Sequence, residues 1–93
     1  MKEIQRLKLV QEEVECLVMH RQAVRTRLCA KWVEKSETYG VALESKVSPE
    51  ALERTHQLFV EIDVECMMAR RSLDEARAFL EEVDQAISRC RDA

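Results

Sequence analysis

The chain has 93 residues, of which 46% are hydrophobic and 35% charged, with one glycine, one proline and a formal net charge of -3. So few turn-forming residues leave little material for sheets, and we expect a single all-α domain over residues 1–93. The negative charge argues against binding to nucleic acid or anionic membranes, and no apolar run approaches the roughly 20 residues of a membrane span.

The first predicted helix covers about residues 3–44 and carries an apolar stripe. The stripe advances in alternating steps of three and four residues, which is typical of a helix that packs lengthwise on another helix. Gly40 is an alternative end for this helix, because glycine is favoured just past a helix C-terminus. We favour the longer helix, which ends near Glu44. The stripe consists of Leu7, Val10, Val14, Leu17, Arg21, Val24, Leu28 and Lys31.

A turn over about residues 45–48 precedes the second predicted helix, which covers about residues 49–91. Ser48 can cap free backbone N–H groups, and Pro49 suits the first helical position. The second helix carries a longer stripe with the same period, and Thr55 is its only polar member. The stripe consists of Leu52, Thr55, Phe59, Ile62, Cys66, Ala69, Leu73, Ala76, Leu80, Val83, Ile87 and Cys90.

If the two helices pack antiparallel, facing residues have numbers with a constant sum, and a sum of 90 places one stripe against the other. The same sum sets Arg21 opposite Ala69, over which its aliphatic stem can lie, and brings Arg25 near Asp63 as an ion pair. It places no cysteine opposite another. We therefore expect free thiols within one molecule, which favours a reducing, cytoplasmic compartment. The cysteines are Cys16, Cys29, Cys66 and Cys90.

Further apolar residues lie opposite the two stripes, and a helical hairpin cannot bury them. The predicted fold is therefore an antiparallel helical hairpin, a coiled coil, that a partner or dimerisation completes to a three- or four-helix bundle. The expected partner is a client protein or a second copy of the chain. The predicted partner-binding residues are Met19, Ala23, Ala30, Val33, Val60, Val64, Met67 and Met68.

Catalytic chemistry is not indicated. Cys16 and His20 are four residues apart and could offer two metal ligands, but no second Cys or His pair faces them. His56 is expected to pack near Trp32 rather than act as a base. The only glycine is Gly40, so a glycine-rich phosphate loop is excluded. We expect a protein that is not an enzyme and uses no metal, cofactor or small-molecule substrate.

The chain resembles the tubulin-binding cofactor A family. Residues 9–24, LVQEEVECLVMHRQAV, resemble the family's valine pairs followed by a Val-Met-aromatic step, with His20 where the family often has tyrosine. In the second helix, Arg71, Leu73, Ala76 and Leu80 match the family's Arg, Leu, Ala and Leu spacing. The resemblance implies a small cytosolic helical bundle that holds β-tubulin during folding and dimer assembly.

The sequence thus favours a non-enzymatic helical chaperone or cofactor that binds a client protein, with β-tubulin as the client that the resemblance implies. Two alternatives remain open. One is a homodimeric coiled-coil scaffold or assembly module, and the other is a small export chaperone, because such chaperones also use helical hairpins.

Overall fold

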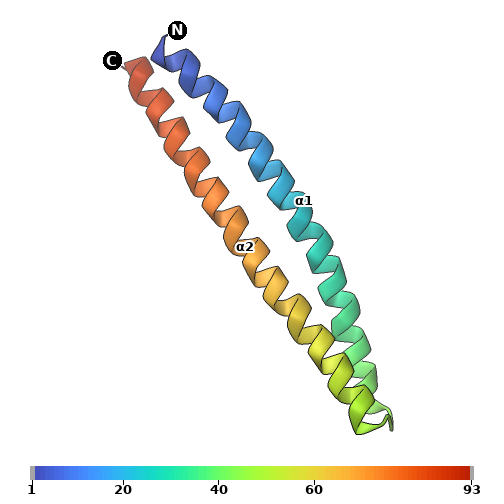
Figure 1. The fold of residues 1–93 in the computed structure, drawn as a ribbon. Helices are drawn as coiled ribbons and strands as arrows, with labels where there is room; N and C mark the ends of the chain where they lie inside the picture. The colour runs from blue at the N-terminus through green and yellow to red at the C-terminus, as the bar shows by residue number, and fades with distance from the viewer. Residues whose placement is uncertain (1, 93) are drawn as a thin grey trace. The chain divides into compact units, whose positions relative to one another are not determined.

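The computed structural model describes residues 2–92, which form two long helices and no strand (Figure 1). Helix α1 is Glu3–Glu44 and helix α2 is Pro49–Asp92. Helix α1 runs through Gly40, so the longer of the two alternatives for its end is correct. The all-α, two-helix prediction is confirmed. Completion into a bundle by a partner or a second copy stays a prediction.

Local hydrogen bonds specify where each helix begins. At the start of α1, the backbone N–H of Lys2 donates to Gln5 Oε1 at 3.3 Å, and the Gln5 N–H donates to the Lys2 carbonyl at 3.0 Å. The first bond is one half of a capping box, and the second is a backbone bond of the first turn. At the start of α2, the Ala51 N–H donates to Ser48 Oγ at 3.2 Å, as the sequence indicates. Pro49 follows in the first helical position, where its missing N–H costs nothing.

The contacts divide the chain into two compact units, each a pair of antiparallel helix segments. Unit 1 joins the chain up to Ala23 with the chain from Arg71, and unit 2 is Val24–Arg70. A single domain stays a prediction. The buried residues of unit 1 are Val14, Leu73, Ala76, Val83 and Ile87, and those of unit 2 are Ala42, Ile62 and Ala69.

The stripe predicted for α2 is confirmed, because each of its residues is buried or half-buried. The stripe predicted for α1 is confirmed at six of its eight residues and wrong at Leu17 and Lys31. These two are exposed, and their neighbours Val18 and Trp32 are half-buried instead. At Lys31 the physical reason is side-chain size, because burying the indole of Trp32 removes far more apolar area from water than burying the stem of Lys31.

The predicted register is also wrong. Side-chain hydrogen bonds join Gln11 to Asp84 and Trp32 to Asp63, pairs whose numbers each add to 95. Arg21 Nη1 donates to the carbonyl of Ser72 at 2.6 Å, and both residues belong to unit 1. The turn occupies residues 45–48, as predicted, and within it the Val47 N–H donates to the Ser45 carbonyl at 2.9 Å. The helix ends that flank this turn, Glu44 and Pro49, have numbers that add to 93, so the turn itself favours a register later than 90.

Candidate protein-binding surface

All eight predicted partner-binding residues are exposed, which binding requires, but their role in binding stays a prediction. Met19 and Ala23 belong to unit 1, and the other six belong to unit 2. Because this division separates them, the candidate site is confined to unit 2. We call it the unit 2 surface, and its members on α2 are Val60, Val64, Met67 and Met68. Ala30 and Val33 lie on α1, on the side opposite its buried stripe and so directed away from α2.

The α2 part of this surface is a single helical face. Val60, Val64, Met67 and Met68 follow one another at steps of four, three and one residue. At about 100° per residue, these positions fall within roughly a quarter of the helix circumference, on the side opposite the buried stripe. Their side chains are between 39% and 67% exposed. Such a cluster on one outward face is typical of an interaction site.

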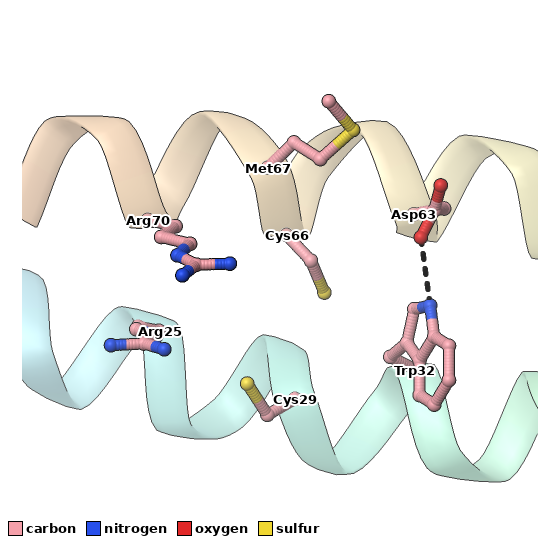
Figure 2. Close-up of a pocket in the computed structure, with 7 residues that line it drawn as sticks. All are labelled: Arg25, Cys29, Trp32, Asp63, Cys66, Met67 and Arg70. Atoms are coloured by element: carbon pink, nitrogen blue, oxygen red, sulfur yellow. Dashed lines mark hydrogen bonds between the residues drawn. The ribbon is translucent and has the colours of Figure 1, made fainter.

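A pocket of about 220 Å³ lies beside the surface in unit 2, and Met67 borders both. Figure 2 shows side chains from both helices around this pocket, with Met67 pointing away from α1. Met67 is the only predicted partner-binding residue among those that line it. The lining residues are Arg25, Cys29, Trp32, Asp63, Cys66, Met67 and Arg70.

One wall of the pocket is fixed by a hydrogen bond between the helices. Trp32 Nε1 donates to Asp63 Oδ1 at 2.9 Å (Figure 2). The indole also packs on Phe59, with ring centroids 5.7 Å apart, and Phe59 stacks on Tyr39 at 5.8 Å. His56 packs on Tyr39 at 5.3 Å, so its predicted place near Trp32 is wrong. This cluster holds the two segments of unit 2 together next to the pocket.

The predicted ion pair between Arg25 and Asp63 is wrong, although both residues line the pocket. Asp63 accepts the indole N–H of Trp32 instead. Within residues 2–92 an ion pair forms only between Lys35 and Glu34, at 3.9 Å along α1. The guanidinium groups of Arg25 and Arg70 therefore border the pocket without an ion-pair partner in the described chain, and the lining carries these two cations and one carboxylate, that of Asp63.

The prediction that no cysteine lies opposite another is wrong for Cys29 and Cys66. Both line the pocket, and Figure 2 shows the Cys66 thiol directed from α2 towards α1 at the level of Cys29. The Cys66 S–H donates to the Leu28 carbonyl at 3.3 Å. Burial raises the pKa of the Cys66 thiol above its usual value, and the neighbouring acidic groups Cys29, Asp63 and Glu65 raise it further. All four cysteines are free thiols, as predicted.

Sequence reasoning missed this thiol pair because it used the wrong register. A sum of 90 places Cys29 level with Glu61, whereas their actual sum of 95 sets Cys29 level with Cys66. The hydrogen-bonding capacity of Trp32 was the available signal, since a half-buried indole N–H needs an acceptor and Asp63 can supply one. Pairing those two residues first would have revealed the facing thiols.

No group of three or more His, Cys, Asp or Glu side chains within residues 2–92 is arranged to hold a metal ion. Neither helix, over its described length, combines the length and apolar character needed to cross a membrane.

Comparison with known proteins adds no relative: no family model, curated protein or solved structure matches the chain. The resemblance to tubulin-binding cofactor A therefore depends on the sequence motifs alone.

Proposed function

We propose that the chain is a non-enzymatic helical chaperone or cofactor that binds a client protein through the unit 2 surface. The observation that carries this proposal is the outward face of α2, where Val60, Val64, Met67 and Met68 are exposed together. Unbranched methionine side chains adapt to partners of different shape, which suits binding to a folding client. The resemblance to tubulin-binding cofactor A supports β-tubulin as the client.

The size of the surface limits how tightly it can bind. Full burial of a large apolar side chain yields about 1.5–3 kcal/mol, and these four side chains are already about half buried, so together they supply roughly 3–6 kcal/mol. A Kd of 1 µM corresponds to about 8 kcal/mol, after the entropic cost of association has been met. For a client that covers this α2 face alone, we therefore expect affinity in the micromolar range or weaker.

A cytoplasmic location forms part of the proposal. It is supported by the four free thiols, because disulfides are rare in proteins of the cytosol.

A second candidate function is a homodimeric scaffold. It is favoured by the large apolar residues that are also exposed in unit 1, among them Leu9, Met19 and Phe79. A client that covers only the unit 2 surface would leave these residues in water, whereas a second copy of the whole chain could cover both sets.

The test is a double variant, Met67→Glu with Met68→Glu, which places two charges on the unit 2 surface. The matched control is Leu43→Glu, because Leu43 is an exposed apolar residue of unit 2 outside this surface. We would measure the molar mass by light scattering, the helical content by circular dichroism, and the binding of purified β-tubulin by titration. The proposal expects a monomer whose binding is weakened at least tenfold by the double variant and little changed by the control.

Each of three other results would contradict client binding at this surface. A stable dimer that the double variant dissociates would identify the scaffold function instead. A monomer that binds β-tubulin equally well with and without the two glutamates would place the functional surface elsewhere. Loss of helical content in the double variant would show that Met67 and Met68 belong to the core, contrary to their exposure.

A further inference from the structure

The thiols of Cys29 and Cys66 share the pocket of unit 2 and come from different helices. Cys29 lies on α1 and Cys66 on α2, both line the pocket, and Figure 2 shows the Cys66 sulfur directed towards α1 at the level of Cys29. The remaining cysteines, Cys16 and Cys90, belong to unit 1 and line no part of this pocket. Two thiols from different helices that border one pocket, with Cys29 close enough to influence the Cys66 thiol electrostatically, are an arrangement that thiol–disulfide exchange can use.

We propose that Cys29 and Cys66 form a dithiol site that reacts with small disulfides and is converted into an intramolecular disulfide between α1 and α2. This inference stands apart from the proposed function, because it depends on the two thiols and not on a client. The substrate class is a low-molecular-weight disulfide that carries carboxylates, since the guanidinium groups of Arg25 and Arg70 border the same pocket.

The two cysteines have different roles because their surroundings differ. Cys29 is exposed, so a dissolved disulfide reaches it first. Cys66 is half-buried, and its S–H is engaged by the Leu28 carbonyl. Burial also raises the pKa of Cys66, which keeps this thiol protonated and slow to attack a dissolved reagent. Cys29 is therefore the attacking thiol and Cys66 the resolving thiol.

The reaction proceeds in two exchange steps. The Cys29 thiolate attacks one sulfur of the small disulfide, its S–S bond breaks, and one small thiolate leaves and takes up a proton. The Cys66 thiol then loses its proton to water and attacks the Cys29 sulfur, which expels the second small thiolate. Two cysteine thiols and one small disulfide thus give one protein disulfide and two small thiols, and two electrons pass from the protein to the small disulfide.

Bond formation requires the two segments to adjust, because a disulfide needs an S–S distance of about 2.05 Å and closely spaced Cβ atoms. The dithiol form has a pocket of about 220 Å³ at this place, and the bond would narrow it. Closing the loop from Cys29 to Cys66 also restricts the unfolded chain. We therefore expect oxidation to raise the urea midpoint of unfolding by roughly 1–2 M.

The experiment incubates the full chain with oxidised glutathione, which bears carboxylates, and with hydroxyethyl disulfide, which does not. Remaining thiols are alkylated in denaturant, and the protein is analysed by intact and peptide mass spectrometry. The expected product is a monomer lighter by two hydrogen atoms, with Cys29 linked to Cys66 and with two alkylated thiols, Cys16 and Cys90. It should form faster with oxidised glutathione, and Arg25→Gln with Arg70→Gln should remove that preference.

Single variants separate the two steps. Cys66→Ser should stop at a stable glutathione adduct on Cys29, whereas Cys29→Ser should react several-fold more slowly and form no link. A Cys16→Ser, Cys90→Ser variant serves as the control, because it keeps both pocket thiols and should oxidise like the parent. Circular dichroism of each variant checks that the helices are intact.

Three results would overturn the inference. The first is a folded protein that forms no link from Cys29 to Cys66 under conditions that oxidise a simple dithiol. The second is a link that forms only in urea, and the third is oxidation that joins separate molecules through Cys16 or Cys90. If the Cys66→Ser variant accumulated no adduct on Cys29, the assigned order of attack would be wrong.

Discussion

Replacing Leu73 by alanine tests the packing of unit 1 most directly. Leu73 is 0% exposed and is the largest side chain in the described chain to be fully buried. The substitution removes three carbon atoms at about 0.8 kcal/mol each, or about 2.4 kcal/mol, and the cavity left behind adds to this loss. We therefore expect the free energy of unfolding to fall by about 3 kcal/mol, within the range of about 2–5 kcal/mol for buried leucines.

The matched control is Leu9→Ala, because Leu9 is also in unit 1 but is 51% exposed. Because Leu9 is only about half buried, its truncation removes about half of the transfer free energy, and we expect the free energy of unfolding to fall by about 1 kcal/mol. Urea unfolding followed by circular dichroism measures both variants. If Leu73→Ala does not fold without urea, Leu73→Met, which keeps the volume, should fold and cost less than about 1.5 kcal/mol. Equal losses for Leu73→Ala and Leu9→Ala would refute the assignment of the core.

Three further substitutions test unit 2. Gly40→Ala should raise the free energy of unfolding by about 0.5–1 kcal/mol, because Gly40 lies inside α1 without a positive φ and an added Cβ meets nothing within 4 Å. A destabilised variant in urea unfolding would contradict helical structure at this position. Trp32→Phe should cost about 1–2 kcal/mol, because the hydrogen bond to Asp63 is lost, whereas Asp63→Asn keeps an acceptor and should cost less. The reverse order would show that the hydrogen bond does not stabilise unit 2.

Local features of the sequence were sufficient to predict the helices and their ends. Ser48 and Pro49 specify the start of α2, because capping and a fixed φ act within a few residues. The stripe of α2 was predicted correctly from end to end. Its residues repeat every 3.5 positions, and this period alone determines which side of a helix turns inward.

The tertiary structure decided how the helices meet. If one helix slides along the other by about half a heptad, two stripes with a 3.5-residue period face each other again. Matching the stripes therefore cannot distinguish a register in which facing residue numbers add to 90 from one in which they add to about 94. The choice depends on contacts between distant residues. The hydrogen bond from Trp32 to Asp63 and the one from Arg21 to the Ser72 carbonyl select the actual register.

The candidate site also has one feature that the sequence predicted and one that only the tertiary structure determined. The exposure of Met67 and Met68 followed from the sequence, because both positions lie off a stripe that the period of α2 specifies. The facing thiols of Cys29 and Cys66 did not, because they lie in different helices and come together in one register only. Periodicity along a chain determines which side of each helix is buried. Contacts across the chain determine which residues of the two helices lie level with each other.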